Sequence, residues 1–248
     1  MASAFFRFKQ FTVWHDRCAM KVGTDGVLLG AWTPMPSRAN ACTRVLDIGA
    51  GSGLIALMLA QRLQAEGRDF RICGIDIDQG AVEQTIFNFA HSPWANHMTA
   101  LLTPLQLFDD NLPFDIIVSN PPYFQNSLKN PNAARATARH TDTLTYDELL
   151  SHAKRLLSSD GIFAIVLPVE AEAEIMHLAE TYHLQPTHIT YVHSKKEKPA
   201  KRILIAMQRA HSNDHISNNT LVIHHFYIES ATSPRSEEYQ ALTREFYL

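Results

Sequence analysis

The residues with the clearest chemical potential are Asn120-Pro121-Pro122-Tyr123, which directly follow the apolar run 114–119. That run has the length and the branched residues of a buried parallel strand. Two consecutive prolines end it, because each lacks a backbone donor and favours extended geometry before it. Asn120 is therefore expected at the carboxyl tip of a strand, where ligands bind in open α/β sheets. Tyr123 places an aromatic ring beside that amide.

Such a tip suits the methylation of an amino group that is conjugated to a ring or a carbonyl. The nitrogen lone pair is delocalised, so the group is a poor nucleophile until acceptors hold its two hydrogens and favour the tetrahedral transition state. The side-chain oxygen of Asn120 and the carbonyl of Pro121 are candidate acceptors, and Tyr123 would stack on the planar group. Taken alone, the motif is equally typical of a turn after a strand.

A glycine loop lies upstream, between a strand that ends near Asp47 and an apolar segment of helical length, 54–60. Its alternating glycines, Gly49, Gly51 and Gly53, let the backbone pass close to a ligand, and the start of the helix offers N–H groups to an anion. A dinucleotide pyrophosphate and the carboxylate of a methionine moiety both fit this pattern. The loop alone does not choose between them.

An acidic residue follows at the tip of the next predicted strand, 70–75. Asp76 can accept both ribose hydroxyls of a nucleoside ligand from that position. Asp78 is better placed to cap the helix that comes next. Both kinds of glycine-loop nucleotide fold have an acid here, so Asp76 indicates a nucleoside without identifying it.

The alternation of strand and helix patterns predicts an α/β fold with right-handed crossovers and a mostly parallel sheet. Strands near 187–193 and 203–207 are joined by so short a loop that they must pair as an antiparallel hairpin. We expect a Rossmann-like, seven-stranded sheet with that hairpin at its end. The whole chain, 1–248, is expected to form one domain. Its parts are a small N-terminal β extension in 1–35, the core in 36–210, and a strand and helix in 211–248.

Composition limits the function classes. The 248 residues carry a formal net charge of -3, so a nucleic-acid role needs its cations gathered on one face. We expect a cytoplasmic protein without membrane association, because no apolar run of about eighteen residues and no signal-peptide pattern is present. None of the histidines has metal-ligand spacing and we expect no metal. The three cysteines are interpreted as reduced thiols.

Two polar segments could supply a cationic face. The loop within 194–202 holds five cations and one anion, which suits phosphates, although a solvated hairpin tip is the simpler interpretation. The stretch 124–143 is long and poor in helix pattern, as expected of a lid or of a surface that contacts a polyanion. The candidate nucleic-acid contacts in these two segments are Lys129, Arg135, Arg139, His140, Lys195, Lys196, Lys198, Lys201 and Arg202.

Together these features resemble the class I methyltransferases that use S-adenosyl-L-methionine to modify exocyclic or amide nitrogens. The resemblance covers almost the whole chain. Within that class, three segments are similar to the family of tRNA1(Val) adenine(37)-N(6)-methyltransferases. They are residues 21–32 (KVGTDGVLLGAW), residues 119–124 with Ala138-Arg139-His140 after them, and residues 198–202 (KPAKR).

The resemblance implies a class I methyltransferase fold and methylation of the adenosine just 3′ of the anticodon of a valine tRNA, with S-adenosylhomocysteine as by-product. It implies that Asn120, Pro121, Pro122 and Tyr123 hold the flipped adenine, and that 21–26 closes over the cofactor. The tRNA is the expected partner; the oligomeric state is open, with a monomer favoured. The implied cofactor-binding residues are Lys21, Gly23, Thr24, Asp25, Asp47, Gly49, Gly51, Gly53, Asp76, Ile77 and Asn120.

One departure concerns the third strand of the core. Many relatives have an acid near its end that accepts from the cofactor's adenine, whereas this chain has Thr103-Pro104. The hydroxyl of Thr103 or a backbone group could substitute, so the contact stays unassigned.

Other functions remain open at this level. A glutamine methyltransferase acting on release factors also carries Asn-Pro-Pro-Tyr, but its extra helical domain would not fit into the residues that precede Asp47. A DNA adenine or rRNA guanine methyltransferase differs only in substrate-facing loops. A catalytically silent RNA-binding module would not need Gly49, Asp76 and Asn120. A dehydrogenase would give no role to the Asn-Pro-Pro-Tyr motif.

Overall fold

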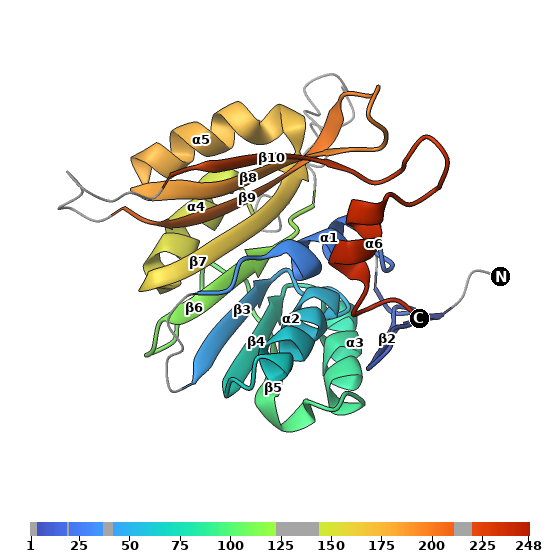
Figure 1. Ribbon diagram of the computed structural model, residues 1–248. Coiled ribbons are helices and arrows are strands. Elements are labelled where there is room, and N and C mark those ends of the chain that lie inside the picture. Colours follow the sequence, from blue (N-terminus) through green and yellow to red (C-terminus); the bar gives the residue numbers. More distant parts are fainter. Residues whose placement is uncertain (1–3, 19, 37–41, 123–143, 211–219) are drawn as a thin grey trace, which may run out of the picture.

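A computed structural model describes residues 4–18, 20–36, 42–122, 144–210 and 220–248, and the structural statements below concern these residues (Figure 1). The strands are β1 (Phe5–Arg7), β2 (Thr12–Trp14), β3 (Thr43–Ile48), β4 (Phe70–Asp76), β5 (Met98–Leu102), β6 (Phe114–Ser119), β7 (Leu157–Pro168), β8 (Leu184–His193), β9 (Ala200–Arg209) and β10 (Val222–Tyr227). The α-helices are α1 (Thr24–Trp32), α2 (Leu54–Ala65), α3 (Gln79–Ala90), α4 (Tyr146–Leu156), α5 (Glu172–Thr181) and α6 (Glu237–Thr243). Two short 3-10 helices are η1 (Ala95–His97) and η4 (Val169–Ala171).

The described residues form one large sheet of eight strands in the order β10-β8-β9-β7-β6-β3-β4-β5. The five strands β3, β4, β5, β6 and β7 all run in the same direction. β9 is antiparallel to both β7 and β8, and β10 is parallel to β8. The predicted α/β class, the antiparallel hairpin and the separate β1–β2 hairpin are confirmed. The expected count of seven strands is corrected to eight, because β10 adds to the outer edge of β8 and satisfies backbone groups there.

Helices cover both faces of the sheet (Figure 1). One apolar core contains residues of α1, α2, β3 and the N- and C-terminal segments. The other contains residues of α4, α5, β6 and β7. β6 and the middle of β7 are buried along their whole length, as a parallel strand between two helical layers must be. The centre of the sheet is therefore a buried support for the loops at its edge.

The two ends of the chain are fixed to the helical layer formed by α2 and α3. The side-chain amide of Asn88 donates to the carbonyl of Trp14 (2.8 Å) and accepts from its N–H (3.0 Å). Gln61 donates to the carbonyl of Glu245 (2.8 Å), and Lys9 donates to that of Arg244 (2.6 Å). No helix in the described part of the chain is long and apolar enough to cross a membrane.

Strand direction decides which loops meet. β9 is antiparallel to β7 and to β8, so β8 and β10 run in the same direction as β3, β4, β6 and β7. The ends of β4 and β6, the hairpin 194–199 and the end of β10 therefore lie at the same edge of the sheet. Asp76, Asn120 and the cations of that hairpin share this edge, as the sequence patterns predicted for the first two.

Candidate active site

The glycine loop folds back onto the tip of β4. Gly49 and the next residue donate their N–H groups to the carbonyl of Ile75 at 2.9 and 3.0 Å. Gly49, Gly51 and Gly53 have φ of +70°, +58° and +75°, which is the left-handed region that favours glycine. A Cβ at Gly53 would meet the Phe89 ring at 2.6 Å, so this glycine is also required for packing between α2 and α3.

Asp76 is oriented by the backbone on both sides. Its Oδ2 accepts from the N–H of Gly51 (2.9 Å), and its Oδ1 accepts from the N–H of Asp78 (3.0 Å). Each carboxylate oxygen keeps further lone-pair capacity toward the open edge. Asp78 caps α3 by accepting from the N–H of Ala81 at 2.7 Å, as predicted. The acid at the tip of β4 is thus a fixed double acceptor.

Asp47 lies behind the glycine loop and is 0% exposed. Its Oδ2 accepts from the N–H of Ala56 (3.1 Å), and its Oδ1 has no hydrogen-bond partner among the described residues. Burial, with a smaller contribution from the charge of Asp76, raises the pKa of Asp47 to about 7 against the effect of the Ala56 hydrogen bond. Asp47 therefore attaches α2 to the end of β3 and does not line the cavity described next.

Asn120 sits at the tip of β6, as the double proline predicted. Ser119 before it donates its hydroxyl to the carbonyl of Ile48 (2.9 Å), which ties the tips of β6 and β3 together. The Oδ1 atom of Asn120 is buried and has no hydrogen-bond partner among the described residues. Pro121 is buried and Pro122 is exposed. The motif therefore places an amide oxygen that no described residue binds at the edge of the sheet that also holds Asp76.

A cavity of about 270 Å³ joins these groups. It contains the glycine loop and Asp76 at one side and Asn120, Pro121 and Pro122 at the other. Its lining is predominantly apolar, with a few polar groups at its ends, which is the pattern of small-molecule and cofactor sites. The residues that line it are Cys18, Met20, Ile48, Gly49, Gly51, Ile75, Asp76, Ile77, Asp78, Ala81, Thr103, Pro104, Leu105, Gln106, Ser119, Asn120, Pro121, Pro122 and Leu144.

Cys18 lines this cavity as a neutral thiol. Burial, and after it the negative charges of Asp76 and Asp78, raise the pKa of Cys18 to about 11. A thiol held in this form is a poor nucleophile. The cavity therefore does not offer a covalent route through cysteine, and no group of three metal-ligating side chains occurs within the described ranges.

The structure brings together only part of the predicted site. Gly49, Gly51, Asp76, Ile77 and Asn120 line the cavity together with Pro121 and Pro122, whereas Asp47 and Gly53 support it from behind. Lys21, Gly23, Thr24 and Asp25 do not line it. Tyr123, Lys129, Arg135, Arg139 and His140 lie outside the described residues.

Asp25 and Arg202 bind each other. The Nε of Arg202 donates to Oδ2 of Asp25 at 2.9 Å, and the two side chains are 32% and 26% exposed. Asp25 was expected at the cofactor and Arg202 at RNA, and in this structure the pair links the start of α1 to β9. The β8–β9 hairpin carries Lys195, Lys196 and Lys198, which are exposed at the same edge of the sheet as Asp76 and Asn120. We refer to these three residues as the hairpin lysines.

Several residues of the cavity had no sequence signal. Cys18 and Met20 reach it from the segment before α1, which carries no periodic pattern. Thr103 and Pro104, after β5, were noted in the sequence without an assigned contact. Leu105 and Gln106 follow them and were not named, although the rule that ligands bind at carboxyl ends of strands would have included them. These residues after β5 occupy the position where an acidic residue was missing from the sequence pattern.

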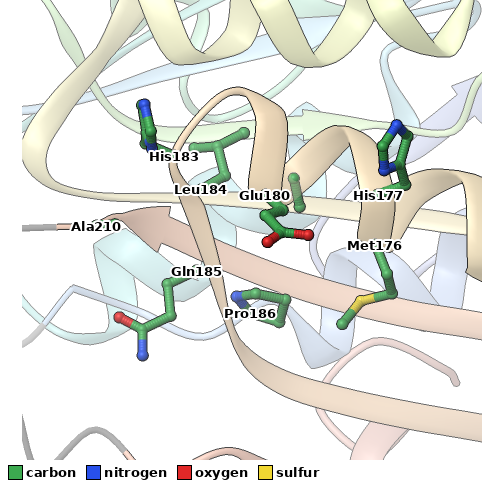
Figure 2. Close-up of a pocket in the computed structure, with 9 residues that line it drawn as sticks. Met176, His177, Glu180, His183, Leu184, Gln185, Pro186 and Ala210 are labelled. Carbon is green, nitrogen blue, oxygen red and sulfur yellow. The ribbon is translucent and has the colours of Figure 1, made fainter.

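A second hollow, of about 550 Å³, lies at the other edge of the sheet, between α5 and the start of β8. Figure 2 shows that the side chains of His177, Glu180 and His183 do not converge on one point. His183 has φ of 54° in the turn that ends α5, and its backbone carbonyl accepts from the N–H of Ala210 (2.9 Å). This hollow is lined by Met176, His177, Ala179, Glu180, His183, Leu184, Gln185, Pro186 and Ala210. It is remote from the glycine loop and lacks the convergent polar groups of the first cavity.

Comparison with known sequences shows similarity to methyltransferases. The family model described as "Methyltransferase domain" matches residues 39–218. The tRNA1(Val) (adenine(37)-N6)-methyltransferase of Phocaeicola vulgatus is 46% identical over 248 residues, covering 100% of this chain and 99% of that protein. The protein of the same name from Aeromonas hydrophila is 44% identical over 243 residues, covering 98% and 97%.

Solved structures support the fold. A predicted O-methyltransferase from Agrobacterium tumefaciens superposes with a TM-score of 0.64 at 17% identity, covering 90% of this chain and 96% of that one. A protein from Listeria monocytogenes described as a class I S-adenosylmethionine-dependent methyltransferase has a TM-score of 0.59 at 13% identity, covering 87% and 65%. At these identities the similarity concerns the fold alone.

Proposed function

Because the chain belongs to the family of tRNA1(Val) (adenine(37)-N6)-methyltransferases, we propose that it transfers a methyl group from S-adenosyl-L-methionine to N6 of adenosine 37 in a valine tRNA. The observation that carries the proposal is the position of Asn120. Its Oδ1 is a buried acceptor without a partner among the described residues, and Asn120 itself lines the same cavity as the glycine loop and Asp76. A buried acceptor of this kind costs free energy unless a ligand satisfies it.

The residues of the cavity fit a nucleoside cofactor with a methionine moiety. Asp76 would accept the ribose hydroxyls, since two backbone N–H groups already fix the direction of its carboxylate. Gly49 and Gly51 would lie against the methionine part, and Ile77, Leu105 and Thr103 would enclose the base. When bound, the cofactor supplies a methyl group on a positively charged sulfur. Asp47 would act indirectly, by holding the start of α2 under the loop.

Asn120 and the carbonyl of Pro121 would accept one hydrogen each from the adenine amino group. As the nitrogen attacks, it becomes tetrahedral and partly positive, and both hydrogen bonds then strengthen. Holding the nitrogen in line with the methyl group accounts for the remaining part of the rate enhancement, because alignment removes entropy from the barrier. The proton lost after transfer can pass to water, so no side chain has to act as a strong base.

The rest of the chain would act with the cavity as one domain. Trp32 of α1 donates its Nε1–H to Thr190 of β8 at 3.0 Å, and the Asp25–Arg202 pair links the same helix to β9. The N- and C-terminal segments are tied to α2 and α3 by the hydrogen bonds given above. We propose that the hairpin lysines contact RNA phosphates, because they stand exposed at the edge that holds Asn120.

The test is a transfer assay with labelled S-adenosyl-L-methionine and separate pools of tRNA, rRNA, DNA and release factors. Nuclease digestion and chromatography then identify the modified nucleoside. The proposal expects label in N6-methyladenosine from valine tRNA alone. Label in a release factor or in rRNA guanosine would replace the substrate, and failure to bind the cofactor by calorimetry would revive a catalytically silent module.

A further inference from the structure

Four rings lie in a continuous row across β8 and β10: Tyr191 stacks on His225 and Tyr227 stacks on His193, while the two histidines meet at their edges. The ring centroids of Tyr191 and His225 are 5.1 Å apart, those of His225 and His193 are 5.2 Å apart, and those of His193 and Tyr227 are 4.9 Å apart. Strand register explains the order, because His225 pairs with Tyr191 and Tyr227 pairs with His193. Alternate residues of both strands therefore place four rings on one face. We refer to Tyr191, His225, His193 and Tyr227 as the ring stack.

Hydrogen bonds fix the orientation of the ring stack. Nδ1 of His193 donates to the carbonyl of Lys198 at 2.7 Å, since a carbonyl can only accept. Nε2 of His193 lies 2.9 Å from Nδ1 of His225, and one hydrogen is shared between them. The hydroxyl of Tyr191 donates to the carboxylate of Glu172. The rings are thus held in place before any ligand arrives, which lowers the entropy lost on binding.

The ring stack is open to solvent. On the opposite face of β10, Phe226 is buried, whereas Val222 and His224 are exposed. His225 is exposed and the other three rings are partly exposed. Ile223, on the same face of β10, is 57% exposed, and Phe226, on the opposite face, is 4% exposed and packs near Tyr239. Core packing accounts for Phe226 but not for the four aromatic or imidazole rings that β8 and β10 leave in contact with water.

The ring stack also has a position relative to the methyl-transfer cavity. β8 is three strands and β10 four strands from β6, so at about 4.8 Å per strand the stack lies roughly 14 to 19 Å from Asn120 along the same edge. The hairpin lysines adjoin it, because His193 is bonded to the backbone of Lys198. Lys195 also binds Glu229, just after β10, at 3.2 Å. Cations and rings thus lie next to each other at the carboxyl ends of β8 and β10.

We propose that the ring stack is a docking surface for unpaired bases of the RNA substrate, with the hairpin lysines on the neighbouring phosphates. This inference rests on the proposed methylation of tRNA. Tyrosine and histidine rings are the side chains on which proteins stack splayed RNA bases. Lysines track the backbone of such a strand. Rings and cations at this distance from Asn120 would hold nucleotides that flank the target and not the target itself.

The experiment measures the affinity of the full-length protein for a fluorescent valine tRNA by anisotropy, with S-adenosylhomocysteine present. Tyr227→Ala and His225→Ala should each weaken binding about tenfold, the usual loss for one base-stacking ring. The loss should fall on the dissociation constant and not on kcat at saturating tRNA. Tyr227→Phe keeps the ring and should rescue the affinity.

The matched control is His224→Ala, which removes an imidazole from the opposite face of the same strand, where His224 binds Glu238. Its tRNA affinity should stay within about twofold of the wild type. Equal binding by Tyr227→Ala and the wild type, with both proteins folded, would overturn the proposal.

A second measurement keeps the inference testable if an alanine variant does not fold. Ultraviolet cross-linking of the wild-type protein to the same tRNA, followed by peptide mass spectrometry, should give adducts within 187–193 or 222–228. Adducts confined to other segments would overturn the ring stack while leaving tRNA methylation intact. A wild-type protein that methylates no tRNA would instead overturn the proposed function on which the inference depends.

Discussion

Replacing Asp47 by asparagine should change how the stability of the protein depends on pH. Asp47 is fully buried and its pKa is raised from 3.8 to about 7, mainly by burial. Between these two values the unfolded chain has lost the proton and the folded protein has kept it, so rising pH favours unfolding. Below pH 3.8 both states are protonated, and above pH 7 both are ionised. The destabilisation therefore grows from about pH 4 to pH 7 and is constant above that.

The magnitude follows from the width of this window. Each pH unit inside it removes about 1.4 kcal/mol, so from pH 5 to pH 8 the wild type should lose about 2 to 3 kcal/mol of folding free energy through this one group. Asparagine cannot ionise and should not show this loss. Its amide can still accept from the N–H of Ala56, while its NH₂ group takes the place of the unpaired Oδ1. That substitution has a cost of its own, but the cost does not vary with pH.

Urea unfolding at pH 5, 6, 7 and 8, followed by far-ultraviolet circular dichroism, measures the difference between the two proteins. All other titrating groups are common to both and cancel. The free energy of unfolding of Asp47→Asn, relative to that of the wild type, should increase by about 2 to 3 kcal/mol from pH 5 to pH 8. A difference that stays constant with pH, with equal denaturant slopes, would show that Asp47 is already ionised in the folded protein.

Three further results are expected. Asp76→Ala should weaken S-adenosyl-L-methionine binding about 10- to 100-fold by calorimetry, because two charge-assisted hydrogen bonds are lost, and an unchanged affinity would remove Asp76 from the cofactor site. Gly53→Ala should lower the free energy of unfolding by about 2 to 5 kcal/mol, because left-handed backbone strain adds to the overlap of the new Cβ with Phe89 at 2.6 Å. Gly67→Ala is the control, with φ of +68° and open space around the new Cβ, and should lower it by only about 1 to 2 kcal/mol. Equal losses for the two variants would show that the overlap with Phe89 has no effect. Alanine at all three hairpin lysines should reduce the slope of log affinity for tRNA against log salt by up to about 2 to 3, and an unchanged slope would place the phosphate contacts elsewhere.

Local patterns in the sequence were sufficient to predict the residues at the centre of the site. Gly49, Gly51, Asp76 and Asn120 each lie at the end of a strand or just beyond it, so the parallel sheet alone brings them to one edge. The role of Asp47 depends on packing that no local pattern reveals. Its place at the end of β3 was evident, but only the packed structure shows that its side chain turns behind the loop and binds the start of α2.

Contacts between distant segments could not be read from the sequence. Asp25 and Arg202 are 177 positions apart, and each was assigned to a ligand because nothing local indicates that they pair. The ring stack depends on the register of β10 against β8, which the alternation of apolar residues does not fix in an exposed edge strand. The sequence pattern predicted β10 as a strand. It did not predict that β10 pairs with β8, because this pairing depends on β8 having a free edge in the folded sheet.

The central claim is that the carboxamide oxygen of Asn120 stabilises the transition state of methyl transfer to an adenine amino group. The most direct measurement compares kcat and the tRNA dissociation constant for the wild type and Asn120→Ala, with cofactor binding checked by calorimetry. Loss of one such transition-state contact predicts a fall in kcat of about 100- to 1,000-fold, with tRNA affinity changed by less than about threefold. Equal losses in kcat and in tRNA affinity would contradict the claim, because Asn120 would then bind substrate and transition state alike.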